Sequence, residues 1–101
     1  MMQSFTKKRH SLSRDEAETL AIAALGFLAG EEHRIIGFVH LTGLSPADLR
    51  RAAGSPEFLT GVLDFIAADE SLLLVFASEQ RIDPTEVMMA RRQLMPEASD
   101  Y

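Results

Sequence analysis

Apolar residues recur along much of this chain every three or four positions, the spacing that gathers them on one side of an α-helix. The first such stretch is predicted to begin at Ser13 and to end near Gly30. Ser13 and Glu16 have the spacing of a capping box, in which each side chain accepts a hydrogen bond from the other residue's backbone N–H. The second half of this stretch is apolar nearly all round, so we expect the helix in the middle of a bundle.

A second helix is predicted from Glu31 to Leu41, and Gly43 is placed to end it in the left-handed conformation. We expect four of its apolar residues to face inward: Ile35, Ile36, Phe38 and Val39. A short third helix is predicted from Pro46 to Ala53, and it can bury little because Leu49 is its only large apolar residue.

The fourth predicted helix, from Pro56 to Ala68, has the clearest division into an apolar and a polar side. The residues expected to face inward are Phe58, Leu59, Val62, Leu63, Phe65 and Ile66. The opposite side is expected to carry Thr60, Asp64 and Ala67. This pattern predicts a helix that lies on the surface of the core.

The unbroken apolar run from Leu72 to Ala77 is compatible with a buried strand or with a helix, and periodicity does not decide between them. Its surroundings favour a helix, because Asp69 is a good N-cap and no second strand-like segment is present to pair with a lone strand. We therefore predict a helix from Glu70 to about Gln80. The last helix is predicted from Pro84 to about Met95.

Three of these helix starts share one pattern, in which a capping side chain stands directly before a proline. Proline suits the first helical position because its missing N–H would have had no partner there. The three pairs are Ser45-Pro46, Ser55-Pro56 and Asp83-Pro84, and two of them continue with an acid at the third helical position, Asp48 and Glu86. The sequence thus predicts the all-α class, as a compact bundle of five to six helices of which one is short.

The chain has 101 residues, enough for one domain with its own core. We place this domain at residues 13–95, between a flexible basic arm at 1–12 and a flexible tail at 96–101. Cysteine is absent, which excludes disulfides, a thiolate nucleophile and a Cys-containing zinc site, and fits a reducing cytoplasm. The longest uncharged stretches, Thr19 to Gly30 and Ile35 to Ala47, are shorter than the ~20 residues that cross a bilayer, so no membrane segment is expected.

Charge is distributed unevenly along the chain. Residues 1–14 carry four basic side chains and no acid, whereas residues 15–101 carry all fifteen acids and six arginines, a net charge of −9. An acidic body repels the phosphate backbone of nucleic acids. We therefore expect nucleic-acid binding by the domain as a whole to be disfavoured.

Four segments of the chain resemble a small bacterial family, the domain of unknown function 3572. They are residues 24–28 (ALGFL), 34–38 (RIIGF), 42–50 (TGLSPADLR) and 58–65 (FLTGVLDF). The resemblance covers about residues 13–95 and rests on helix-cap and core residues. It implies a compact all-helical fold in the bacterial cytoplasm, and it carries over no catalytic residues.

No motif in the sequence points to catalysis, a cofactor or a metal ion. His33 and His40 share one side of the second predicted helix, but the rise of about 1.5 Å per residue separates them by about 10 Å, too far to hold one metal together. None of the serines lies in a nucleophile elbow, and the glycines form no phosphate-binding loop. We expect no enzyme activity; an active site assembled from scattered residues is the alternative.

Two surfaces favour a noncatalytic protein-interaction or regulatory module. The last predicted helix carries Met88, Met89 and Met95, and methionine suits an adaptable contact with another protein. The second predicted helix places Gly37 between His33 and His40, where another backbone could approach closely. The partner is an unknown protein or a second copy of the chain, with the last helix as the expected contact.

DNA binding is a further alternative. Residues 31–53 have the outline of a helix-turn-helix, in which Arg50 and Arg51 of the short helix are candidates to contact phosphates or bases. The same helix is otherwise poor in basic and amide side chains, and the acidic body weighs against this interpretation.

Overall fold

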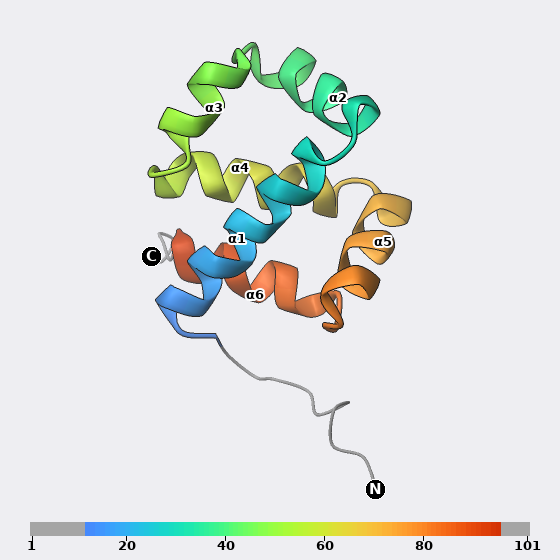
Figure 1. The fold of residues 1–101 in the computed structure, drawn as a ribbon. Helices are drawn as coiled ribbons and strands as arrows, with labels where there is room; N and C mark the ends of the chain where they lie inside the picture. The colour runs from blue at the N-terminus through green and yellow to red at the C-terminus, as the bar shows by residue number, and fades with distance from the viewer. Residues whose placement is uncertain (1–11, 96–101) are drawn as a thin grey trace, which may run out of the picture.

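The computed structural model describes residues 12–95, which form six α-helices and no strand (Figure 1). The helices are α1 (Arg14–Ala29), α2 (Glu32–Thr42), α3 (Pro46–Ala52), α4 (Pro56–Ala67), α5 (Glu70–Gln80) and α6 (Thr85–Leu94). The predicted all-α bundle with one short helix is therefore confirmed. The run from Leu72 to Ala77 is helical, as its surroundings indicated. The basic residues before Leu12 and the segment 96–101 lie outside the described residues.

Side-chain caps begin most of these helices where the sequence predicted them. Ser13 and Glu16 form the capping box of α1, with N···O distances of 3.0 and 2.9 Å. Ser45 and Asp48 form a second box at α3. A third cap lies at α5, where the Asp69 carboxylate accepts the backbone N–H of Leu72 at 3.1 Å. These bonds satisfy N–H groups that have no partner inside the helix.

The start of α6 differs from the prediction by one residue. Asp83 accepts hydrogen bonds from both the backbone N–H and the hydroxyl of Thr85, at 2.9 and 2.8 Å, so Pro84 precedes the helix and is not its first residue.

Two other helices, α2 and α5, end at residues in the left-handed conformation. Gly43 ends α2 with φ of 76°, as predicted, and Arg81 ends α5 with φ of 59°.

The core lies between α1, α4 and α6. Figure 1 shows α4 and α6 side by side and running in opposite directions, with α1 crossing both. On α1 the crossing side is built from small residues, and Ala17, Ala21 and Ala24 are completely buried. Small side chains allow helices to approach closely, so α1 occupies the middle of the bundle as expected.

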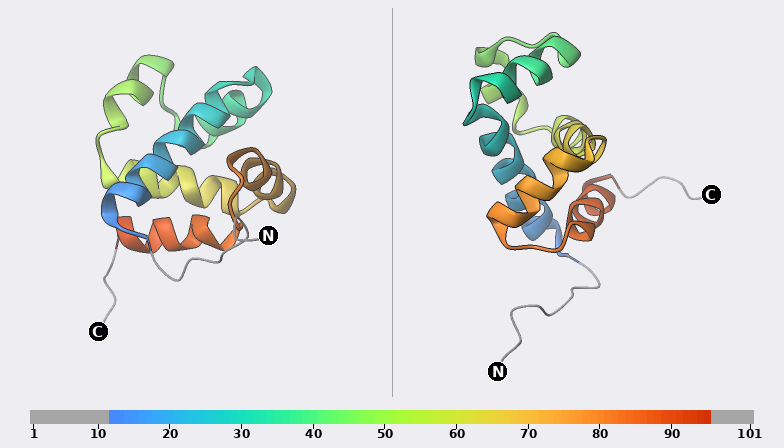
Figure 2. Two further views of the ribbon diagram at one scale, coloured as in Figure 1. Left: turned by 60° about the horizontal axis from the view of Figure 1, so that its bottom comes forward. Right: turned by 90° about the vertical axis from the view of Figure 1, so that its right-hand side faces the viewer.

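The helices α2 and α3 form a separate layer above this core, at the end of the molecule opposite α6 (Figure 2). Phe38 is the one fully buried side chain of α2, and it packs edge-on against Phe58 and Phe65 of α4, with ring centroids 5.8 and 5.2 Å apart. Ile36 was expected to face inward but is 50% exposed. The inward side of α2 is occupied by Phe38, Ile35 and Val39, which turns Ile36 toward solvent.

One further position corrects the sequence-based picture of burial. Thr60 was placed on the outer side of α4 but is 7% exposed, and its hydroxyl donates a hydrogen bond to the Pro56 carbonyl at 2.8 Å. This bond satisfies the hydroxyl within the helix, so the side chain can be buried. On α5, Leu74 and Val75 are 50% and 43% exposed. None of the helices within residues 12–95 is long and apolar enough to cross a membrane.

Candidate functional site

The outward side of α2 is the most accessible apolar surface among the sites proposed from the sequence. We call it the α2 face and define it by the six exposed residues Glu32, His33, Ile36, Gly37, His40 and Leu41. They recur at intervals of one, three and four, so they lie on one side of the helix. Ile36 and Leu41 are 50% and 71% exposed, and both are large aliphatic side chains in contact with water. The predicted residues His33, Gly37 and His40 all belong to this face.

The opposite side of α2 holds this face in a fixed orientation. The Arg34 guanidinium lies 4.0 Å from the centre of the Phe27 ring and donates a hydrogen bond to the Phe27 carbonyl at 3.2 Å. Arg34 also lies 3.8 Å from the Glu31 carboxylate. The Arg34 contacts attach α2 to the end of α1, and buried Phe38 attaches it to α4, so that the two together set which residues point outward.

A hollow lies beside the α2 face and shares several of its residues. It has a volume of about 510 Å³ and is lined by Glu32, Ile35, Ile36, Val39 and His40. The acid stands at the first turn of the helix and the histidine at the last turn, with aliphatic side chains between them. A partner helix or strand with an apolar centre and charged ends would match this arrangement.

Gly37 lies on the α2 face but is not required for packing within the chain. A Cβ atom added there would lie 3.8 Å from the Cζ atom of Phe65, which is an ordinary van der Waals contact. Its backbone is in the right-handed helical region, where glycine has no advantage over alanine. The internal packing of the molecule therefore leaves the glycine at this exposed position unexplained.

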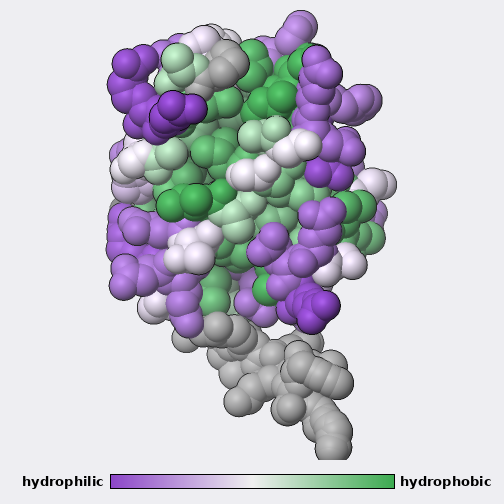
Figure 3. Space-filling model, in the orientation of Figure 1, coloured by the Kyte–Doolittle hydropathy of each residue, from purple (hydrophilic) through white to green (hydrophobic). Residues whose placement is uncertain are grey.

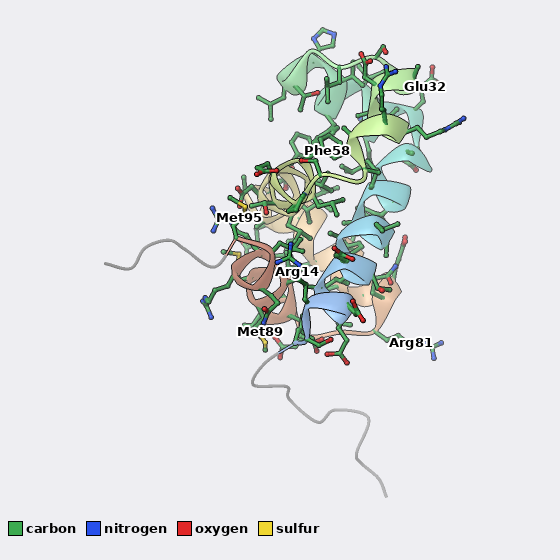
Figure 4. All side chains as sticks on the ribbon, turned by 90° about the vertical axis from the view of Figure 1, so that its left-hand side faces the viewer. Arg14, Glu32, Phe58, Arg81, Met89 and Met95 are labelled. Atoms are coloured by element: carbon green, nitrogen blue, oxygen red, sulfur yellow. The ribbon has the colours of Figure 1, made fainter. Side chains whose placement is uncertain are left out.

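The methionines of α6 are divided between surface and core. Met88 and Met95 are 43% and 40% exposed, whereas Met89 packs against the core cluster. Figure 4 shows Met89 on α6 at the end of the molecule far from Glu32 on α2. The methionines and the α2 face are thus two separate surfaces.

The two arginines of α3 have different surroundings. Arg50 is exposed, while a terminal nitrogen of Arg51 lies 2.8 Å from the Asp48 carboxylate. Hydrogen bonds from the Ser45 side chain and backbone, and then from Arg51, hold the pKa of Asp48 below its usual value. Arg51 therefore already has an acidic partner, and Arg50 alone is left to meet a phosphate.

A second hollow, which the sequence did not indicate, lies between the first half of α1 and the corner from α5 to α6. It has a volume of about 300 Å³. Its lining consists of Leu12, Asp15, Glu16, Thr19, Leu20, Ala23, Gln80 and Glu86. Glu86 is only 8% exposed, although the sequence presents it as an ordinary acid in the first turn of a helix. Within residues 12–95, no three His, Asp or Glu side chains are arranged to hold a metal ion.

Apolar surface also occurs away from these sites. Figure 3 shows hydrophobic residues over the middle of one face of the molecule, with polar residues along its borders. Ile22 of α1 is 52% exposed, close to the exposed fraction of Ile36 on α2. Ile22 does not line either of the two hollows, so it provides a reference for an exposed isoleucine outside a candidate site.

Comparison with known proteins identifies one family. No curated protein and no solved structure matches the chain. A family model described as a protein of unknown function (DUF3572) matches residues 14–97, which include all six helices. The resemblance seen in the cap and core segments is confirmed, and the chain belongs to the DUF3572 family.

Proposed function

We propose that this protein is a noncatalytic interaction module, and that it pairs with a second copy of itself through the α2 face. The observation that carries the proposal is the exposure of Ile36 and Leu41, at 50% and 71%, beside a hollow on a helix that is firmly anchored on its other side. Burying such side chains in an interface removes apolar area from water, which is the main favourable term in association.

The order of residues along the α2 face is self-complementary. Glu32 and His40 each stand four positions from Ile36, on opposite sides of it. When two copies of α2 pack antiparallel about Ile36, Glu32 of each copy meets His40 of the other, and the two isoleucines meet at the centre. The antiparallel arrangement also aligns the helix dipoles favourably. A twofold interface uses one patch twice in this way.

The α2 face is favoured over the methionines of α6 because of what each surface offers a partner. Among the apolar residues of α6 and its C-cap, only Met88 and Met95 are well exposed, and the exposed Arg92 stands between them on the same side of the helix. Two such surfaces would bring Arg92 of each copy close to the other, which opposes pairing. A partner for α6 would have to be acidic, whereas α2 complements itself.

The expected pairing is weak and depends on protein concentration. The helix α2 has eleven residues, so the contact between two copies is smaller than the roughly 1,200–2,000 Å² buried in stable complexes. Weak pairing suits a regulatory contact that forms and dissociates with protein level.

Sedimentation velocity over a wide range of protein concentrations tests the proposal. We expect the wild-type chain to shift from monomer toward dimer as concentration rises, and Ile36→Glu to remain monomeric because it places two carboxylates at the centre of the contact. Ile22→Glu is the matched control, since Ile22 is equally exposed on α1. A wild-type chain that stays monomeric throughout, or an Ile36→Glu variant that pairs like the wild type, contradicts the proposal.

Gly37→Ala separates the effect on folding from the effect on pairing. Alanine fits within the chain and is the better helix former, so we expect the monomer to be stabilised by about 0.5–1 kcal/mol. The added methyl group would keep two α2 backbones apart, so pairing should weaken. Chemical denaturation measures the first effect and sedimentation the second. A variant that is more stable and pairs as well as the wild type would show that Gly37 is outside the interface.

A further inference from the structure

The hollow at the corner between α5 and α6 contains a buried carboxylate that has no partner among the residues that the structure describes. Glu86 lines the hollow and is 8% exposed. Its backbone N–H donates to the Asp83 carbonyl at 2.8 Å, but within residues 12–95 no hydrogen bond or ion pair reaches its carboxylate. Buried carboxylates are normally paired or hydrogen-bonded, so this one requires an explanation.

The surroundings of Glu86 add negative charge and do not supply a counter-ion. Asp15 and Glu16 of α1 line the same hollow, and Glu16 accepts the backbone N–H of Ser13 at 2.9 Å. Arg81 follows the lining residue Gln80 in the chain, but Figure 4 shows its side chain projecting away from the body of the molecule. Glu86 lies in the first turn of α6, and the start of a helix is electropositive.

We propose that this hollow binds an organic cation, an ammonium or guanidinium group on an alkyl stem, with Glu86 as its principal partner. The cationic group would pair with Glu86, and Asp15 at the rim would contribute attraction at longer range. The stem would lie against the aliphatic wall formed by Leu12, Leu20 and Ala23. Thr19 and Gln80 supply further hydrogen-bonding groups for the remaining N–H donors.

The size of the hollow fits one such group. Its volume of about 300 Å³ corresponds to roughly ten water molecules, which is room for the end of one lysine or arginine side chain and not for a folded segment. A bare metal ion would not use the aliphatic wall, and the three carboxylates are not arranged around a common point.

Two sources could supply the cation, and the chemistry is the same for both. One is a separate amine or a basic side chain of another molecule. The other is the chain itself, because Lys7, Lys8 and Arg9 precede Leu12 by three to five positions. An extended stretch of that length spans at most roughly 10–18 Å, and Leu12 is already part of the wall.

NMR titration of the full chain with N-acetylarginine methylamide tests the proposal, with the methyl signals of Leu12, Leu20 and Ala23 as reporters. The neutral analogue N-acetylcitrulline methylamide has the same shape and is the control ligand. We expect the arginine probe to shift the wall methyls and the citrulline probe to leave them unchanged. Wall methyls that respond equally to both probes, or that respond to the arginine probe neither in the wild-type chain nor after Lys7, Lys8 and Arg9 are replaced by alanine, overturn the proposal.

Matched variants identify the carboxylate. Glu86→Gln keeps the shape of the side chain, and we expect it to weaken binding of the arginine probe by about tenfold because the charged partner is lost. Glu79→Gln removes one exposed acid of α5 outside the hollow and should change binding less than about twofold. Equal weakening by both variants would show only a general effect of charge and would overturn the assignment of Glu86.

A third variant distinguishes the two sources. Replacing Lys7, Lys8 and Arg9 by alanine empties the hollow if the chain's own basic segment occupies it, so the wall methyls shift without ligand and the probe binds more tightly. If the natural ligand is a separate cation, the same variant leaves the wall methyls in place and probe binding unchanged. Both outcomes support a cation site, and each names its occupant.

Discussion

The layer of α1, α4 and α6 and the layer of α2 and α3 are held by different means. The helices α1 and α4 each bury five residues, spread along their length. The helix α2 buries one, Phe38, and adds the contact of Arg34 with Phe27. The first layer therefore depends on many buried residues, whereas α2 is held by one fully buried side chain, the partly buried Ile35 and Val39, and the Arg34 contact.

This difference indicates which helices of so small a domain keep surface available for a partner. A helix that is buried on most sides has little surface left for a partner. A helix attached through a few strong contacts keeps its outward side free, as the exposed Ile36 and Leu41 illustrate. Segments with few buried contacts also open more readily than the core, so the α2 layer is expected to be the less stable part.

Phe38→Ala should have the largest effect and should show the difference between the two layers most clearly. Removing a buried phenylalanine ring costs about 3–5 kcal/mol. Because Phe38 is the main attachment of α2 to α4, we expect this loss to appear first as local opening of α2 and α3. Hydrogen exchange should therefore show faster exchange in these two helices than in α1, α4 and α6.

Leu28→Ala is the matched core change, since Leu28 of α1 is completely buried. Its expected cost of about 2–5 kcal/mol should reduce the free energy of global unfolding, with faster exchange in all six helices. If Phe38→Ala gives the same uniform pattern, the two layers form a single cooperative unit and do not differ in how they are held.

Arg34→Gln should have an intermediate effect. The variant loses the cation–π contact with Phe27 and the hydrogen bond to its carbonyl, which together contribute about 1–2 kcal/mol. Arg50→Gln removes an exposed arginine of α3 and should change the free energy of unfolding by less than about 0.5 kcal/mol. Equal values for the two variants in urea denaturation would show that the Arg34 contacts do not hold α2.

Acidification should give the smallest effect, confined to the start of α3. Asp48 has a lowered pKa in the folded chain, so its contribution is present above its unfolded pKa and is lost as pH falls through the folded one. We expect amides of α3 to lose protection as the pH falls below about 4, the usual pKa of an aspartate. Ser45→Ala removes the strongest cause of the shift and should move the NMR titration midpoint of Asp48 upward.

Helix boundaries could be predicted well because their causes are local. The capping boxes Ser13/Glu16 and Ser45/Asp48 and the left-handed Gly43 act through neighbouring residues, and all three are confirmed. The start of α6 was predicted one residue too early, at Pro84. The Asp83 carboxylate accepts hydrogen bonds from both the backbone N–H and the hydroxyl of Thr85, the first residue of the helix. The family was also predictable, since its resemblance rests on these same segments.

Burial was harder to predict because it depends on which side of a helix another helix covers. In α2 the apolar residues extend over more than one side, and periodicity alone did not distinguish exposed Ile36 from buried Phe38. Glu86 is a polar residue whose burial the sequence did not indicate. An acid in the first turn of a helix is common because the helix start is electropositive, so nothing in the sequence shows that this one is buried. Its neighbours in the hollow come from residues 12–23 and 80, which only the fold brings together.

The packing of α1 against α6 has a consequence for the synthesis of this chain. The buried side of α1 is completed by residues about sixty positions later, and Gln93 closes the contact with a hydrogen bond to the Leu12 carbonyl at 2.8 Å. At a translation rate of about 5–20 residues per second, α1 is synthesised roughly 3–12 seconds before α6. During that interval the apolar side of α1 lacks its cover, so a chaperone or the ribosome surface has its best opportunity to bind the nascent chain there.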